Sequence, residues 1–373
     1  MTDTGRSGES PGRIDRRTLL GGAAAAAGVG LFNINHAWSK DVVYNGEVFD
    51  AGGAEVRIGE WGGFWEDSVR KFWLNDFEKQ YNCKVLWDSS FPWFPKFVAA
   101  GVKNPPYAIT NWNLPEMYKT ARAGDFFMPL DEVIPNVPNA AGLWDFATRT
   151  KIGITWTYGQ YSFGYRTDLA DPPPAKFVDF WQPRFAGKRA TYITSNTLQM
   201  VFFLTSAAVF GKDEYDLKAG YDAMKRVTPI KQSDFTGNMQ TLLERGEIAT
   251  GVQWEGEMYA MEDRGVKVSQ YIWQEKKPLL TQTKTISRYT DPMQKKLAFA
   301  LMNRTLDPGI FGKFADVFYL RPAHKDVVIT PKMAAKGVTN TAESTQGYWI
   351  PDWPRYLDHE DEIVDTVNGI FSA

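Results

Sequence analysis

The stretch VRIGEWGGFWEDSVRKFWLNDFEKQYNCKVLW, residues 56–87, decides the fold class of this chain. It opens with a short alternating segment, turns at two glycines, and continues into residues 64–81, where apolar side chains recur at helical spacing. Glu66 and Asp67 fall in the first turn of this expected helix, where the helix dipole favours acidic groups. Residues 83–87 then have the composition of a strand. Such a strand, turn, helix and strand unit builds parallel sheets with ligand sites at the carboxyl ends of the strands.

The same alternation of short strands and helices continues to the C-terminal part of the chain. Further strands are expected at residues 107–110, 151–165, 188–193, 248–254 and 276–286. Further helices are expected at residues 112–123, 196–209, 215–227, 239–245 and 291–306. The fold class is therefore α/β. About 335 residues follow the N-terminal segment described below, which is long for one domain, so two lobes are expected.

The composition excludes several classes of protein. The 373 residues carry 42 basic and 44 acidic side chains, and a net charge of −2 gives no bulk attraction to nucleic acid. One cysteine, Cys83, cannot form a disulfide within the chain. Only 3 His stand against 14 Trp, 16 Tyr and 24 Phe, so we expect no metal site and no cofactor. The composition is that of a soluble globular protein rich in flat side chains.

The N-terminal segment is typical of an export signal. Arg16 and Arg17 precede residues 21–32, a run of almost only Ala, Gly, Val and Leu. A twin arginine before a moderately apolar stretch indicates a Tat-type signal peptide, for which we expect residues 1–37. The run is too short to span a membrane, which takes about twenty apolar residues. No cysteine stands directly after the run, so a lipid anchor has no attachment point, and we expect a soluble periplasmic product.

Four motifs in order resemble a known family. The first is FGYRTDL at 163–169, followed by the prolines at 172–173 and FWQPRFAGK at 180–188. The others are ERGEI at 244–248 with GVQWEG at 251–256, NRTLDP at 303–308, and YLRP at 319–322. Together they resemble the type II periplasmic solute-binding proteins that feed ABC importers, in the branch that holds spermidine/putrescine and ferric-iron binders. The resemblance covers roughly residues 54–340.

This resemblance implies an architecture and partners. Two α/β lobes, each a mixed, mainly parallel sheet flanked by helices, would enclose a ligand cleft and close on a solute like a hinged trap. We expect lobe one at residues 54–158 plus 282–325, and lobe two at residues 159–281 plus 326–373. The implied partners are a small-molecule solute and an ABC permease in the inner membrane. We expect a monomer that binds no nucleic acid.

The resemblance also implies aromatic binding residues. Trp61 follows the first strand at a glycine turn and matches a cleft tryptophan of the polyamine branch, as Trp254 does. Trp112 and Thr110 fall near a cleft tyrosine and a cleft serine of that branch. Three aromatic side chains at matched positions favour an organic solute or a cation held between ring faces. An isolated tryptophan in a chain with fourteen is otherwise more often a core residue.

Departures from the branch narrow the expected solute. Relatives neutralise a diammonium ligand with carboxylates, because a buried ammonium without a partner is costly. The matching positions here are the amides Asn196, Gln199 and Gln282. Glu255 and Glu257 lie beside Trp254, and either could supply one negative charge. The alternative is that Glu255 is solvated and Glu257 caps the next helix. Another candidate is a set of two cations, Arg321 and Lys284, which could bind a carboxylate or phosphonate or could simply be surface charges.

The function predicted from the sequence is capture of a small polar organic solute for an ABC importer, without catalysis. The alternatives are a polyamine binder proper, an exported glycosidase with a carboxylate pair, and a binding protein associated with a sensor. Iron binding is disfavoured because no adjacent tyrosine pair stands at the matched place. No nucleophile-elbow G-x-S-x-G occurs, and the scarcity of histidine makes a catalytic triad improbable, so no catalytic residue is predicted.

Overall fold

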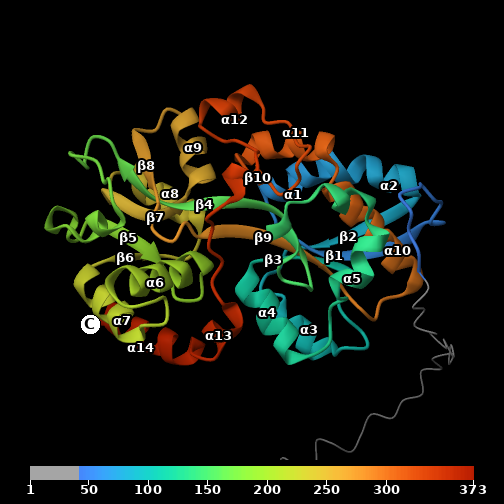
Figure 1. Ribbon diagram of the computed structural model, residues 1–373, viewed down its shortest axis with the longest axis horizontal. Coiled ribbons are helices and arrows are strands. Elements are labelled where there is room, and N and C mark those ends of the chain that lie inside the picture. The colour runs from blue at the N-terminus through green and yellow to red at the C-terminus, as the bar shows by residue number, and fades with distance from the viewer. Residues whose placement is uncertain (1–41) are drawn as a thin grey trace, which may run out of the picture. The chain divides into compact units, whose positions relative to one another are not determined.

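Ten strands form one sheet in the computed structural model, which describes residues 42–373 (Figure 1). The order of paired neighbours is β2-β1-β3-β9-β4-β7-β5-β6, with β8 and β10 paired to β4. The strands are β1 Ala54–Gly59, β2 Cys83–Asp88, β3 Ile109–Trp112, β4 Ile154–Arg166, β5 Arg189–Tyr192, β6 Lys231–Ser233, β7 Thr250–Trp254, β8 Val268–Ile272, β9 Leu279–Ile286 and β10 Arg321–Pro322. The signal peptide predicted for residues 1–37 lies outside the described residues.

The unit predicted at residues 56–87 is present. β1 pairs in parallel with β2 and with β3, and Val56 lies opposite Val85. Between β1 and β2, helix α1 (Phe64–Val69), one π-helical turn (Arg70–Leu74) and helix α2 (Asn75–Tyr81) follow one another without a break. Gly63 precedes α1 with φ 65°, a left-handed conformation that a side chain would strain. The glycine turn is therefore a backbone requirement of this entry into the helix.

Strand β4 joins two groups of strands. Its residues 154–160 pair antiparallel with β9, and its residues 161–166 pair antiparallel with β7 and β8. β5 completes the second group through parallel pairing with β6 and β7. The first group consists of β1, β2, β3, β9 and β10. Strand β4 thus runs across the junction between the groups, with β9 paired to its first half (Figure 1).

Helices cover the strands in both groups. Those that follow strands of the first group, or pack on them, are α3 Phe94–Ala100, α4 Leu114–Ala123, α5 Leu130–Val133, α10 Pro292–Thr305, α11 Pro308–Phe318 and α12 Pro331–Ala335. The others are α6 Thr197–Phe210, α7 Leu217–Val227, α8 Thr236–Glu244, α9 Glu255–Asp263, α13 Trp353–Leu357 and α14 Glu360–Ser372. The helices predicted at 112–123, 196–209, 215–227 and 291–306 are confirmed with small shifts at their ends. Helices α13 and α14 were not predicted; α13 packs on α4 and α14 packs on α7.

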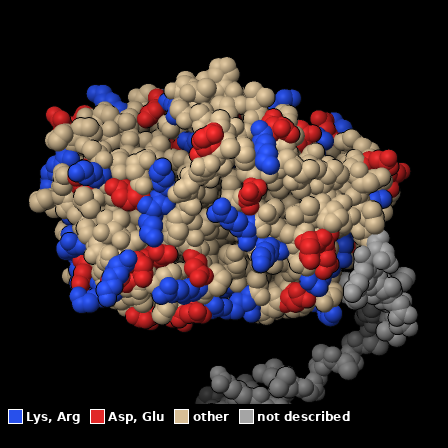
Figure 2. Space-filling view, viewed as in Figure 1, with Lys and Arg blue, Asp and Glu red and all other residues tan. Residues whose placement is uncertain are grey.

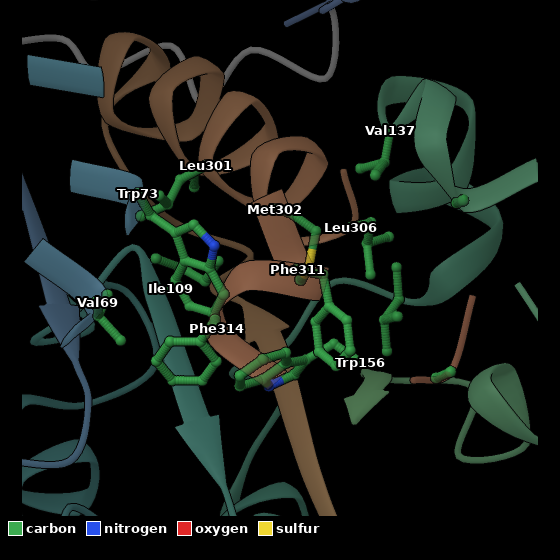
Figure 3. Packing of buried hydrophobic residues seen from close by; sticks show 14 of the residues in the cluster. Val69, Trp73, Ile109, Val137, Trp156, Leu301, Met302, Leu306, Phe311 and Phe314 are labelled. Atoms are coloured by element: carbon green, nitrogen blue, oxygen red, sulfur yellow. The ribbon is translucent and has the colours of Figure 1, made fainter. Parts of the chain in front are cut away.

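A cluster of aromatic rings packs under the first group of strands. Trp73 lies with its ring centre 4.6 Å from that of Phe314 and 5.1 Å from that of Trp156 (Figure 3). Phe314 comes from α11 and Trp156 from β4, so the cluster ties the crossing strand to the helix layer. All three side chains are almost fully buried. Most of the aromatic residues that stood out in the composition are used in this way, as core.

The charged side chains are mixed in sign. Figure 2 shows Lys and Arg interspersed with Asp and Glu over the face in view. Many of them form exposed ion pairs, such as Lys218 with Asp222. Within residues 42–373, no helix combines the length and the hydrophobicity that a membrane span needs. In the same range, no group of three or more His, Cys, Asp or Glu side chains is placed to hold a metal ion.

Candidate functional site

A cavity of about 440 Å³ lies at the carboxyl ends of strands from both groups. Its size is in the range of small-molecule sites, about 300–1,000 Å³. The position follows from the topology, because open α/β sheets place their ligands beyond the carboxyl ends of the strands. The lining residues are Trp61, Trp65, Phe91, Asn113, Gly159, Ile193, Ser195, Asn196, Thr197, Leu198, Asp234, Phe235, Thr236, Trp254, Leu280, Gln282 and Leu320.

One wall of the cavity is a cluster of tilted aromatic rings beyond the end of β1. The ring of Trp61 lies 5.2 Å from that of Phe91 and 4.8 Å from that of Trp93. Trp93 is fully buried, so the rings behind Trp61 hold it in place. Ring faces at such a wall bind flat or cationic groups.

Another wall is built on Trp254, at the end of β7. A Cβ atom added at Gly159 would lie 2.8 Å from the Trp254 ring, and one added at Gly256 would lie 2.1 Å from it. Real contacts of a Cβ atom are longer than this, so both positions need glycine while the ring stays where it is. Gly159 belongs to β4, and the indole therefore packs directly on the crossing strand.

Beneath the cavity, Glu60 joins several polar groups. Its carboxylate pairs with the ammonium group of Lys284, and both side chains are buried. It also accepts hydrogen bonds from Nε1 of Trp65 at 3.1 Å and from Nδ2 of Asn111 at 2.7 Å. A buried carboxylate is tolerated when a countercharge and hydrogen bonds replace water, as they do here.

Gln282 connects this buried network to the cavity. Its Oε1 atom accepts from Nε1 of Trp61 at 2.6 Å and from Nδ2 of Asn111 at 3.0 Å. Its Nε2 atom donates to Oδ1 of Asn113 at 3.2 Å. Asn113 stands at the N-terminus of α4, but its side chain makes no capping hydrogen bond to that helix.

The wall beyond β5 and β6 carries the carboxylate of the cavity. Asn196 caps α6 by accepting from the backbone N of Leu198 at 2.9 Å, and its Nδ2 donates to the carbonyl of Asp234 at 3.0 Å. The Asp234 carboxylate accepts from the side chain of Asn238 at 2.6 Å and from the backbone N of Phe235 at 2.9 Å. The Asn238 hydrogen bond lowers the pKa of Asp234, which is therefore charged at neutral pH. Among the described residues that line the cavity, Asp234 is the only ionisable one.

A second cavity of about 640 Å³ adjoins the first and shares Phe91, Asn113, Ser195 and Thr197 with it. Four acidic side chains line it, with one basic side chain, Lys119, which pairs with Glu360 at 2.7 Å. The acidic side chains are Glu116, Glu360, Asp361 and Asp365. Such an excess of one sign raises the local concentration of cations near the opening.

No protein-family model and no curated protein matches the chain. Solved structures do. An extracellular solute-binding protein from Bordetella parapertussis aligns with a TM-score of 0.70 at 19% identity, over 84% of this chain and 98% of that one. The binding protein AgtB from A. tumefaciens, in complex with agropinic acid, aligns with a TM-score of 0.66 at 17% identity, over 86% of this chain and 99% of that one. This chain has the two-lobed fold of ABC-transporter solute-binding proteins.

A third similar structure extends the range of ligands that occur on this solute-binding-protein fold. It is a spermidine/putrescine ABC transporter substrate-binding protein from Streptococcus pneumoniae, in complex with calcium and HEPES, with a TM-score of 0.62, 17% identity, and 86% and 100% of the two chains covered. The predicted fold is confirmed. The ligands named for these structures differ, so the fold by itself does not determine the solute.

Four of the predicted binding residues lie together at the cavity. Trp61, Asn196, Trp254 and Gln282 all line the cavity. Thr110 and Trp112 do not; both are buried. The indole of Trp112 donates to Thr285 at 2.8 Å, and Trp93 lies between its ring and that of Trp61.

The other three predicted residues lie behind the cavity walls. Gln199 is buried and accepts a hydrogen bond from the hydroxyl of Thr191. Glu257 accepts from Gln240 behind the Trp254 wall, and burial raises the pKa of its carboxyl group. Arg321 does not face the cavity but binds Glu255 through two hydrogen bonds, described below.

The two cationic side chains considered for an anionic solute, Arg321 and Lys284, are thus paired with carboxylates of the protein. Nε and Nη2 of Arg321 donate to the two oxygens of Glu255 at 2.6 and 2.8 Å. Glu255 is fully buried rather than solvated, and Lys284 pairs with Glu60. The structure also adds residues that the sequence reasoning missed, Asp234 and Asn113 among them. Both follow strands, and that placement was the available signal.

Proposed function

We propose that this chain is the periplasmic solute-binding component of an ABC importer. It captures a small polar organic solute in the cavity between two lobes and delivers it to a membrane permease. The observation that carries the proposal is the position of the cavity, whose walls come from both groups of strands beside the antiparallel pair β4 and β9. Closure on a solute needs a site that both lobes share, because the solute must stabilise the closed form over the open one.

The lobes proposed for this function are residues 54–158 plus 282–325 and residues 159–281 plus 326–373, although α12 in the last range packs with the first group, where Met333 joins its core. The exchange of partners along β4 after residue 160 supports the first boundary. The C-terminal part bridges the proposed lobes, since Lys119 of α4 pairs with Glu360 of α14 and Arg122 of α4 pairs with Asp358 at 2.9 Å. These are partly exposed pairs, which are weak enough to break and re-form when the lobes move.

The contacts at the cavity also bear on the alternatives. A glycosidase needs two carboxyl groups facing the sugar, and Asp234 is the one carboxylate among the described cavity-lining residues. A polyamine held between carboxylates is disfavoured, because Asn196 and Gln282 stand where the relatives carry acids and are held by protein hydrogen bonds. A neutral or singly charged organic solute fits better.

A binding screen of residues 38–373 tests the proposal. Amino-acid derivatives, sugars, polyamines and phosphonates are added singly, and the thermal midpoint is followed, since a ligand of the native state raises it by mass action. One class should raise the midpoint, and Trp61→Ala and Trp254→Ala should each abolish the rise. Trp144→Ala is the control, because this indole lies outside the cavity and donates to Asn340. Turnover of a solute, or stabilisation that both cavity variants retain, would refute a binding function at this site.

A further inference from the structure

The side-chain amides at the cavity have a determined orientation. Asn111 is buried between an indole and a carboxylate: Nε1 of Trp156 donates to its Oδ1 at 3.0 Å, and its Nδ2 donates to Glu60 at 2.7 Å. An indole nitrogen only donates and a carboxylate only accepts. Turning the Asn111 amide over would therefore place its NH₂ group against the donor of Trp156 and its oxygen against the acceptor of Glu60. Because Glu60 pairs with Lys284, its carboxylate is the hydrogen-bond acceptor at this end of the network.

This orientation passes to Gln282. Asn111 Nδ2 and Trp61 Nε1 are both donors, and both face the same Gln282 atom, at 3.0 and 2.6 Å. That atom must therefore be the carbonyl oxygen, and the NH₂ group of Gln282 must lie on the other side. The NH₂ group of Gln282 donates to Oδ1 of Asn113. The NH₂ group of Asn113 is therefore on the side away from Gln282.

The proposed lobe-one wall therefore presents donors. Gln282 and Asn113 both line the cavity, and within residues 42–373 no hydrogen bond occupies Nδ2 of Asn113. Asn113 is at a helix N-terminus, where an asparagine ordinarily accepts from the backbone, and here it does not. The side-chain carbonyl oxygen of Gln282 already accepts two hydrogen bonds and that of Asn113 accepts one. An ammonium group placed here would meet N–H donors and would leave its own protons unpaired.

The wall beyond β6 is opposite in character. One oxygen of the Asp234 carboxylate accepts from Phe235 and Asn238. In the part of the chain that the structure describes, the second oxygen accepts no hydrogen bond from another residue. Trp254 and Phe235 line the same cavity, and ring faces attract cations. This side therefore favours a positive group.

We propose that the solute is bipolar, with an oxygen acceptor bound by the NH₂ groups of Gln282 and Asn113 and a cationic group bound near Asp234. The proposal rests on the binding function above and specifies the solute class. The fixed amide orientation acts against a diamine, which would put an ammonium against donors. Rejection of the wrong group in this way contributes to specificity as much as attraction of the right one does.

Probes of equal chain length separate the possibilities. An ω-amino acid and its ω-amino amide carry an acceptor and a cation, a diamine carries two cations, and a dicarboxylate carries two acceptors. Titration calorimetry should give dissociation constants for the two bipolar probes about tenfold or more below those for the diamine and the dicarboxylate. A diamine that binds as tightly as the amino acid would overturn the proposal while leaving the binding function intact.

Gln282→Glu tests the donor directly, because it keeps the shape and replaces NH₂ by an acceptor. It should weaken the ω-amino acid about tenfold or more relative to the diamine. Gln274→Glu is the matched control, since this exposed side chain lies outside the cavity and donates to the carbonyl of Ile272. An unchanged ratio of the two constants in Gln282→Glu would overturn the assignment. If no solute of any class stabilises the wild-type chain, the binding function itself fails.

Discussion

The buried pair of Glu255 and Arg321 allows a prediction about stability. Glu255 begins α9 beside the cavity wall, and Arg321 lies on β10, which pairs with β4. The side chains are 0% and 6% exposed, and two hydrogen bonds join them. Burial by itself would lower the pKa of Arg321, but the attraction of Glu255 outweighs it and raises that pKa. The guanidinium group therefore stays charged with Glu255 as its partner.

Glu255→Gln removes the charge and leaves a similar shape. The amide oxygen can still accept from the backbone N of Gln160, which lies 3.0 Å from the Glu255 carboxylate. The expected loss is therefore that of an uncompensated buried guanidinium, about 3 kcal/mol or more of unfolding free energy. Urea unfolding measures it as a shift of the midpoint at constant slope.

A matched control and a double variant complete the experiment. Glu66→Gln disrupts an ion pair with Arg70 whose side chains are 26% and 35% exposed, and should cost about 0.5 kcal/mol or less. Replacing both Glu255 by Leu and Arg321 by Met should cost less than Glu255→Gln alone, since no unpaired charge remains. If Glu255→Gln costs no more than Glu66→Gln, Arg321 does not depend on this partner and the reasoning is wrong.

Three further predictions concern the cavity wall, a buried acid and the single thiol. Gly159→Ala should displace Trp254 and weaken solute binding in calorimetry, whereas Gly369→Ala, a helical site with no neighbour within 4 Å of an added Cβ, should leave binding unchanged. Burial raises the pKa of Glu116 to about 7, so its contribution to stability is present at low pH and is lost as pH rises from about 4.5 to 7. Glu116→Gln should flatten the fall in the urea midpoint over that range, and an unchanged slope would contradict this. Burial raises the pKa of Cys83 to about 11, so iodoacetamide at pH 8 should modify the native chain much more slowly than the urea-unfolded chain, and equal rates would refute the assignment.

Much of the fold could be predicted because its signals are local. The apolar residues at helical spacing over 64–81 and the glycine at 63 are close together in the sequence. The structure has the strand, helix and strand that they predict. The helices α13 and α14 were missed. Their buried residues, Trp353 and Ile363 among them, are apolar because of contacts with distant elements, and α13, with 5 residues, offers little periodicity to detect.

The site could be predicted only in part. Trp61 and Trp254 follow strands in matched motifs, and both line the cavity. Trp112 belongs to an equally plausible motif and lies behind Trp93 in the core, because a tryptophan is suited to either place. Asp234 follows a strand, but so do Glu60 and Glu255, and that placement by itself does not select the acid that lines the cavity.

The sequence by itself determined the fold class, the composition that leaves few groups for catalysis, and the exchange of carboxylates for amides at Asn196, Gln199 and Gln282. Only the tertiary structure decided what those amides present to a solute. Gln282 lies 221 residues from Trp61, and Lys284 lies 224 residues from Glu60. The direction of an amide depends on which neighbours donate and which accept, and those neighbours meet only when the chain has folded.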